Sequence, residues 1–236
     1  MSRNYYLFTL CLIIILSSFQ LKAKSQKRFL FVISAHEYGY FLPELITPLR
    51  ILSDANVRVD IASPSGNEGH AVATKRLSDK DNQYFKSIGK KIPKPLALVD
   101  VDTSLYAGIY VVGGSGPMMD LYNHKHLSRI INELNNKNKI ISADCHGPIA
   151  LAGVKLSNGE FLVKGRKLTA KSNAEESHWA NSHYSFLVED KLTKNGAVYS
   201  AAGRGEAYIV IDGNLVTGQN PASAEPLALK LVELLN

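Results

Sequence analysis

Short apolar runs recur along the chain at residues 27–34, 57–62, 106–112 and 139–143. The first reads K-R-F-L-F-V-I-S, and its apolar residues follow one another without alternating with polar ones. Continuous runs of this length are typical of parallel strands that are covered on both faces of a sheet. We therefore predict a central, mostly parallel sheet.

Segments with helical spacing lie between and after these runs. Residues 43–55 and 119–134 each place leucine or isoleucine on one face, and residues 221–235 repeat the pattern. The expected inner stripe of the last segment is Ala224, Leu227, Leu231 and Leu234. Because strand and helix alternate, we predict one doubly wound, flavodoxin-like α/β sheet with helices on both faces. Ligands of such sheets bind beyond the carboxyl ends of the strands.

Three stretches interrupt the alternation. Residues 160–171 alternate in polarity and predict a hairpin that turns at Lys164-Gly165. Residues 207–217 predict a second hairpin around Asp212-Gly213. Residues 67–101 are more polar, and we interpret them as a surface excursion with one short helix.

The first 23 residues have a composition of their own. Arg3 precedes a nearly continuous apolar run at residues 5–19, and Ala23 offers a small residue at a cleavage point. This three-part pattern is that of a secretory signal peptide, and the run is short for a spanning helix, which needs about 20 residues. We predict a signal peptide over 1–23 and one domain over 24–236. The mature chain would then be periplasmic or secreted, without stable membrane insertion; an uncleaved amino-terminal anchor is the alternative.

The composition of the whole chain is that of an ordinary globular protein, with 45% hydrophobic and 20% charged residues among 236. The net charge of +6 raises nucleic acid as a partner. The basic residues are scattered, however, and aromatic residues are not interleaved with them as a nucleic-acid face requires. We therefore expect no nucleic-acid partner.

Cys145 is the one cysteine that remains when residues 1–23 are removed. It ends the apolar stretch I-I-S-A-D-C-H-G, and Gly147-Pro148 then lead into a short helical pattern. A strand, a sharp turn and a helix present a side chain at the carboxyl end of a sheet. A lone thiol in an exported chain is either free or bonded to a second molecule. The turn favours a reactive nucleophile over a small buried hydrophobic residue.

Other groups are expected at the same edge of the sheet. Gly113-Gly114 follows the third apolar run, and a backbone N–H there and that of His146 would form an oxyanion hole beside Cys145. His146 adjoins the thiol, but neighbouring side chains usually diverge, so its ring could instead act on the substrate. The histidines show no compact ligand spacing, and we predict neither a metal nor another cofactor.

Two acids compete for the role of proton carrier. Glu37 lies in the first loop, and Glu44 lies in the first turn of the helix that follows it. An acid in a first turn ordinarily suits the helix dipole. A buried acid with a raised pKa could instead pass a proton to the substrate of a neighbouring thiol. Spacing alone does not choose between Glu37 and Glu44.

The motifs V-V-G-G-S-G-P-M-M-D-L, A-D-C-H-G-P-I-A-L-A-G and K-L-T-A-K-S-N-A-E-E resemble the ThiJ/PfpI superfamily, within the class I glutamine amidotransferase-like fold. The resemblance spans residues 28–236 and fits the branch of glutathione-independent glyoxalases (glyoxalase III) and Hsp-type holdase chaperones. It implies that Cys145 is the nucleophile, that His146 is its neighbouring histidine, and that Glu44 is the acid.

The same resemblance implies further site residues. The backbone of Gly114 and His146 would supply the oxyanion donors. Many relatives have histidine after the glycine pair, where this chain has Ser115, which departs from that pattern. A third acid of a triad would be Glu175 or Glu176.

The resemblance implies three functions. The first is a D-lactate dehydratase type of glyoxalase, a lyase that converts methylglyoxal and other small reactive carbonyls through a cysteine hemithioacetal. The second is a stress-protective holdase or a redox sensor with an oxidisable cysteine. The third is a cysteine amidohydrolase or protease-like enzyme. Relatives often form homodimers, so a homodimer is also expected.

Overall fold

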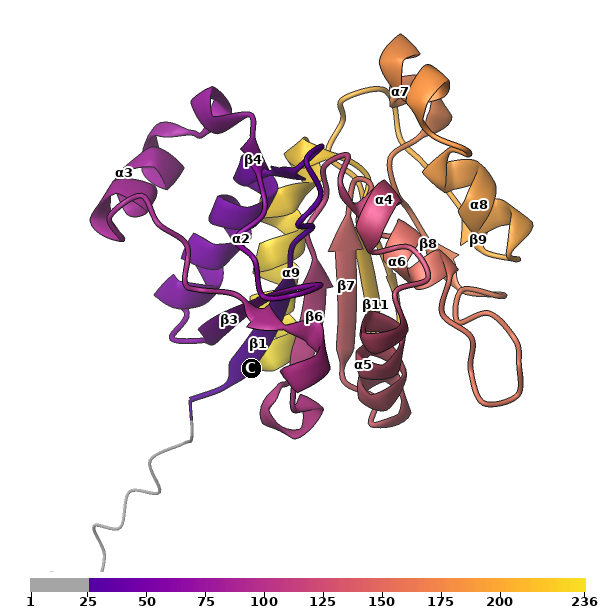
Figure 1. Ribbon diagram of the computed structural model, residues 1–236, viewed down its shortest axis with the longest axis horizontal. Helices are drawn as coiled ribbons and strands as arrows, with labels where there is room; N and C mark the ends of the chain where they lie inside the picture. The colour runs from indigo at the N-terminus through magenta and orange to yellow at the C-terminus, as the bar shows by residue number, and fades with distance from the viewer. Residues whose placement is uncertain (1–25) are drawn as a thin grey trace, which may run out of the picture.

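The computed structural model describes residues 26–236, and a seven-stranded sheet forms its centre (Figure 1). The strand order is β10-β11-β7-β6-β1-β3-β5. All neighbouring strands pair in parallel except β10 and β11, which are antiparallel. The mostly parallel sheet predicted from the apolar runs is therefore confirmed. The signal peptide predicted over residues 1–23 lies outside the described residues.

The strands of this sheet, in chain order, are β1 (Arg28–Val32), β3 (Arg58–Ser63), β5 (Leu96–Ala97), β6 (Gly108–Val111), β7 (Ile140–Asp144), β10 (Ile209–Asp212) and β11 (Leu215–Gly218). Two short parallel pairs lie outside it: β2 (Tyr40–Phe41) with β4 (Ala71–Val72), and β8 (Lys167–Leu168) with β9 (Val198–Tyr199). The helices are α2 (Leu42–Asp54), α3 (Asp79–Ser87), α4 (Pro117–Asp120), α5 (Lys125–Asn136), α6 (Ile149–Ala152), α7 (His178–His183), α8 (Val188–Lys194) and α9 (Ala224–Leu235).

Helices cover both faces of the sheet, as the alternation predicted. On one face α2 and α9 lie side by side against the sheet, and α5 lies on the opposite face (Figure 1). Each face has its own apolar cluster, one filled from α2 and α9 and the other from α5, α6 and α8. None of the helices within residues 26–236 has both the length and the hydropathy of a bilayer-crossing helix.

The single helix predicted over residues 119–134 is wrong, because the chain forms two helices there. α4 ends at Asp120 and α5 begins at Lys125. Asn123 between them has φ of 55°, in the left-handed region that a continuous helix does not contain. The His124 ring then accepts the N–H of Leu127 and caps α5. The apolar spacing predicted the buried stripe of α5 but could not detect this interruption.

The hairpin predicted at Lys164-Gly165 is also wrong. Residues Lys167–Leu168 form β8 and pair in parallel with the distant strand β9. The antiparallel bridge in this region joins Lys155 to Phe161. The second predicted hairpin, around Asp212-Gly213, is confirmed as β10 and β11.

Two further expectations need adjustment. Leu234 in α9 is 42% exposed, and Leu235 is buried in its place, so the inner stripe continues from Leu231 by a full turn. The polar excursion over residues 67–101 contains the expected helix as α3, but it also supplies β5 to the edge of the sheet.

Candidate active site around Cys145

Cys145 lies directly after β7, at the carboxyl end of the parallel strands. Its φ of 52° is in the left-handed region, which is uncommon and costly for a residue other than glycine. The turn is fixed on both sides: the Cys145 N–H donates to the Gly218 carbonyl at 3.0 Å, and the Gly147 N–H donates to the Asp144 carbonyl at 2.6 Å. The sharp turn predicted from the sequence therefore holds the thiol in one place.

His146 lies beside the thiol and against an acid. Its Nδ1 atom is 3.6 Å from Cys145 Sγ, and its Nε2 atom is 2.9 Å from Glu176 Oε1. A proton on Nε2, donated to Glu176, leaves Nδ1 free to accept the thiol proton. The two neighbouring side chains do not diverge as expected, because the left-handed turn at Cys145 rotates one toward the other.

The structure separates the roles of Glu175 and Glu176. Glu175 Oε1 accepts the Gly205 N–H and the Asn220 side-chain amide, each at 2.8 Å. Burial alone would raise the pKa of Glu175, but these hydrogen bonds outweigh it and the pKa is lowered. Glu176 is the acid that contacts His146, whereas Glu175 joins the 203–206 loop to the segment before α9.

Glu44 is fully buried in the first turn of α2. The Tyr110 hydroxyl donates to its backbone carbonyl at 2.8 Å and so joins α2 to β6. Among the described residues neither carboxyl oxygen of Glu44 has a hydrogen-bond partner. Burial, reinforced by the nearby Asp144, raises the pKa of Glu44 well above its ordinary value. The raised pKa favours the protonated form of this carboxyl group.

Gly113 allows Glu44 and Cys145 to come together. A Cβ atom at Gly113 would collide with the Glu44 carboxyl group and would lie 2.7 Å from the Cys145 Cβ atom. The acid and the thiol thus occupy the space where a side chain would otherwise be. Glu37, the alternative acid, is exposed in the loop after β1.

The thiol is buried as well, with 5% of Cys145 exposed. Burial raises the pKa of the thiol, Glu44 acts in the same direction when it is ionised, and the Lys171 ammonium opposes them. The resting thiol is therefore neutral and needs a base when it reacts. His146 is the base in contact with it.

Asp144 was not selected from the sequence. It is fully buried, and its Oδ1 atom accepts the Gly113 N–H at 3.1 Å. Burial raises its pKa to about 8. The sequence does contain a signal that could have identified Asp144, namely an acid within the apolar stretch I-I-S-A-D-C. The three residues that precede Asp144 in β7 are buried.

Lys171 was also missed. Its backbone N–H donates to the Cys145 carbonyl at 2.8 Å, and its side chain lines the same cavity as the thiol. It belongs to the segment K-L-T-A-K-S, which the apolar pattern did not connect with the thiol because that segment is distant along the chain.

The backbone groups expected to bind an oxyanion lie at the same edge. Gly114 has φ of 110° and approaches so closely that a Cβ atom there would lie 2.6 Å from the Phe41 backbone nitrogen. Gly114, Ser115 and His146 line the cavity together with Cys145. The Gly113 N–H is already donated to Asp144, so Gly114 is the donor available from this glycine pair.

The cavity over the thiol has a volume of about 240 Å³. It is lined by apolar, aromatic and charged side chains together with the glycine turn: Phe41, Val72, Arg76, Gly114, Ser115, Cys145, His146, Lys171, Glu175, Glu176, Ser177, Trp179, Ala180, Tyr184 and Pro221. Within residues 26–236 no group of three or more His, Cys, Asp and Glu side chains is arranged to hold a metal ion.

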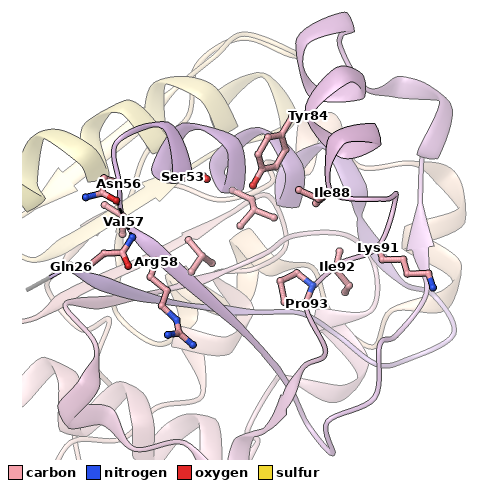
Figure 2. A pocket seen from close by; sticks show the side chains of 12 residues that line it. Gln26, Ser53, Asn56, Val57, Arg58, Tyr84, Ile88, Lys91, Ile92 and Pro93 are labelled. Atoms are coloured by element: carbon pink, nitrogen blue, oxygen red, sulfur yellow. Dashed lines mark hydrogen bonds between the residues drawn. The ribbon is translucent and has the colours of Figure 1, made fainter.

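A larger cavity of about 570 Å³ lies at the opposite end of the strands (Figure 2). Gln26, Asn56 and Arg58 lie at one end of it and Lys91 at the other. No cysteine, histidine or acidic residue of the described chain lines it. We place the chemistry at the smaller cavity because the groups that can transfer protons converge there.

The family of the chain follows from this arrangement and from direct comparison. The model of the DJ-1/PfpI family matches residues 28–234. This range includes the parallel sheet, Cys145 at its left-handed turn and Glu44 of α2. The chain therefore belongs to the DJ-1/PfpI family.

Two curated relatives and two solved structures indicate which proteins the chain resembles. The chain is 29% identical to the glutathione-independent glyoxalase HSP31 of Saccharomyces cerevisiae, over 84% of this chain and 89% of that protein. It is 27% identical to glyoxalase 3 of Candida albicans, over 79% and 85%. The crystal structure of glyoxalase III from Candida albicans matches with a TM-score of 0.80 at 25% identity, over 88% of this chain and 96% of that chain. The Rapid Encystment Protein 24 KDa of Francisella tularensis matches with a TM-score of 0.83 at 28% identity, over 89% and 100%.

Proposed function

We propose that the protein is a glutathione-independent glyoxalase that converts methylglyoxal to D-lactate and related 2-oxoaldehydes to 2-hydroxy acids. The names of the two curated relatives support this reaction class. The observation that carries the proposal is the fully buried Glu44 carboxyl group, whose pKa is raised by burial, beside the Cys145 thiol. Such an acid can give a proton to a ketone oxygen and take one back, which moving a hydrogen between two adjacent carbons requires.

In the first step the Cys145 thiol adds to the aldehyde carbon. The S–C bond forms, the C=O π bond breaks, and the thiol proton passes through His146 Nδ1 to the new oxygen. The product is a hemithioacetal. Glu176 holds the His146 ring in the orientation that this transfer needs, because the two groups are 2.9 Å apart.

The second step moves hydrogen between adjacent carbons. His146 removes the proton from the former aldehyde carbon while Glu44 gives its proton to the ketone oxygen, which yields an enediol. The ketone carbon then takes up the proton from His146, and the hydroxyl on the former aldehyde carbon returns a proton to Glu44. The result is the thioester of a 2-hydroxy acid. The aldehyde carbon loses the two electrons that the ketone carbon gains, so no external oxidant takes part.

In the last step water cleaves the thioester. His146 accepts a proton from the water as it attacks the thioester carbon, the C–S bond breaks, and the thiol is restored. The backbone N–H groups of Gly114 and His146 are the proposed donors to the oxyanion of this step.

The test is a time course of methylglyoxal consumption and D-lactate formation, without glutathione, for the wild type and for Cys145→Ala. We expect the substitution to abolish both, since no other cysteine lies within residues 26–236. Wild-type turnover no faster than that of Cys145→Ala would refute the proposal.

A cysteine hydrolase is the second candidate, and the contact of Cys145 Sγ with His146 Nδ1 favours it. Hydrolysis of an activated ester uses the thiol, His146 and Glu176 but transfers no hydrogen between carbons. Glu44→Gln should therefore spare hydrolysis of p-nitrophenyl acetate while it removes methylglyoxal turnover. Wild-type esterase activity without any methylglyoxal turnover would favour the hydrolase.

The signal-peptide pattern of residues 1–23 supports a further part of the proposal, that the enzyme acts outside the cytoplasm. The check is the amino-terminal sequence of the protein recovered from the extracytoplasmic fraction. A mature chain that begins after Ala23 is expected, and full-length protein confined to the cytoplasm would contradict export.

A further inference from the structure

Two cationic side chains line the Cys145 cavity without an ion pair. Lys171 and Arg76 both contribute to the wall. Among residues 26–236 the ion pairs involve other cations, and neither Lys171 nor Arg76 takes part in one. Lys171 is half-buried and Arg76 is exposed, so both charges are accessible from the cavity.

The acidic residues of the same wall are covered. Glu176 has only 2% of its side chain exposed, and its carboxyl group contacts the His146 ring. Glu175 is 7% exposed; one oxygen accepts two hydrogen bonds, and the other is buried away from solvent. The charges that a molecule entering the cavity meets are therefore positive. A cleft whose accessible charges share one sign attracts ligands of the opposite sign.

Lys171 and Arg76 mark two depths of the cavity. Lys171 lies near the nucleophile, because its backbone bonds to the Cys145 carbonyl and its ammonium lowers the pKa of the thiol. Arg76 lies where the cavity meets a neighbouring hollow of about 400 Å³, which shares Phe41, Arg76 and Pro221 with it. The positive side chains thus extend from the thiol to the edge of the cavity, beyond which the exposed Glu225 lines the neighbouring hollow.

The cavity is larger than methylglyoxal requires. Its volume is about 240 Å³, whereas a cavity needs only about 10–15 Å³ to hold one water molecule. Methylglyoxal also presents only a methyl group beyond its two carbonyls, and that group gains nothing from Lys171 or Arg76. The unused volume and the unused charges indicate a longer, anionic substrate.

We propose that the preferred substrates are 2-oxoaldehydes that carry a carboxylate tail, with the aldehyde at Cys145 and the tail held by Lys171 and Arg76. This inference rests on the proposed function. The bond changes are those given above: the S–C bond forms at the aldehyde and water later breaks it. The tail carboxylate does not react, so the product is a 2-hydroxy dicarboxylate.

The experiment compares kcat/KM for 4,5-dioxopentanoate, which is methylglyoxal with a carboxymethyl group on its methyl carbon, and for the neutral 2-oxohexanal. We expect the wild type to favour the anionic substrate by about 10-fold or more. Charge-assisted hydrogen bonds of ~1.5–3 kcal/mol predict that Lys171→Gln lowers this preference by about 10- to 100-fold. Lys171→Arg should restore most of it, and Arg76→Gln should lower it by a smaller factor.

The matched control is Lys91→Gln, which removes a lysine from the wall of the other cavity. It should leave the preference for the anionic substrate unchanged. Equal kcat/KM for both substrates in the wild type, or a Lys171→Gln variant that slows both by the same factor, would overturn the inference while methylglyoxal turnover still supports the glyoxalase. A loss shared by both substrates is what a lysine that only stabilises the thiolate would produce.

A binding measurement keeps the inference testable if no 2-oxoaldehyde is turned over. Alkylation of Cys145 by iodoacetamide is followed in the presence of D-2-hydroxyglutarate or D-lactate. We expect the dicarboxylate to protect the thiol at about 10-fold lower concentration in the wild type, and this advantage to vanish in Lys171→Gln. Equal protection by the two acids would refute the anionic subsite, and absence of turnover would separately refute the glyoxalase.

Discussion

Aspartates at the two ends of the parallel sheet, the buried Asp144 and the half-buried Asp60, have pKa values shifted in opposite directions. At the carboxyl end, Asp144 accepts one N–H, its second oxygen has no partner among the described residues, and burial raises its pKa to about 8. At the amino end, beside the larger cavity, Asp60 is bonded by Arg28 and by the Tyr106 hydroxyl at 3.1 Å. Burial raises the pKa of Asp60, but these partners outweigh it and the pKa is lowered.

This difference supports our assignment of the chemistry to the carboxyl end. The amino end has the larger cavity, which no acidic residue of the described chain lines, and the nearby Asp60 is neutralised by Arg28 as in an ordinary structural site. The carboxyl end has the smaller cavity, yet it keeps two carboxyl groups without charged partners next to a thiol. Perturbed acids that remain uncompensated are characteristic of functional sites. Size alone would have favoured the cavity at the amino end.

The sharpest test of the carboxyl end is Glu44→Gln. Glutamine keeps the shape of the side chain but holds no transferable proton, so we expect kcat/KM for methylglyoxal to fall by about 10²- to 10³-fold. The control is Glu37→Gln, which changes the exposed acid of the neighbouring loop and should leave the rate within about 2-fold. Comparable losses in the two variants would show that Glu44 has no special role.

Gly113→Ala tests how closely the acid and the thiol are packed. The added Cβ atom would lie 2.7 Å from the Cys145 Cβ and 2.9 Å from the Asp144 carbonyl. We expect a loss of about 10- to 100-fold in kcat/KM and of about 1–3 kcal/mol in the free energy of unfolding. Gly203→Ala is the control, because its Cβ would meet only the movable, exposed end of Glu206. Full activity in Gly113→Ala would mean that this packing is dispensable.

The pH dependence of stability should separate the two aspartates. The pKa of Asp144 is raised, so its stabilising contribution is complete below its ordinary pKa of 3.8 and is lost as the pH rises toward about 8. Between these two pH values, the ionisation of Asp144 lowers the free energy of unfolding by up to ~1.4 kcal/mol per pH unit. Asp144→Asn, which keeps an acceptor for Gly113, should flatten this decline in denaturant titrations at pH 5, 6.5 and 8.

Asp60→Asn should show the opposite dependence. The lowered pKa of Asp60 means that its contribution is present above its ordinary pKa of 3.8 and is lost as the pH falls below it. The loss of stability caused by Asp60→Asn should thus be full at pH 7 and shrink at pH 3. If both substitutions changed stability with the same sign of pH dependence, the contrast between the two ends would fail.

The smallest effect is expected from Arg58→Gln in the larger cavity. Arg58 pairs with Asp60 at 3.3 Å, but 58% of its side chain is exposed, so the pair contributes less than about 1 kcal/mol. We expect kcat/KM for methylglyoxal within about 2-fold of the wild type. A loss above 10-fold would show that the two cavities are coupled.

The fold could be predicted in its main lines because strand and helix periods are local properties of the sequence. The errors fall where local pattern and tertiary context disagree. The helix over 119–134 breaks at Asn123, and the segment around Lys164-Gly165 pairs with β9 instead of with itself. A parallel partner about 30 residues away leaves no turn signal for a hairpin rule to detect.

The sequence by itself determined the parallel sheet, the position of Cys145 at a turn, and the loops that lie beside Cys145. The carboxyl ends of parallel strands lie at the same edge of a sheet, so the turns that follow them meet there. Only the tertiary structure decided which charges surround the thiol. Four features of the site depend on α2, β7 and residues 169–176 coming together from distant parts of the chain. They are the burial of Glu44, the pairing of His146 with Glu176 instead of Glu175, the buried carboxyl group of Asp144 and the Lys171 ammonium without an ion pair. Desolvation and charge act through space, and the linear order of residues does not contain those distances.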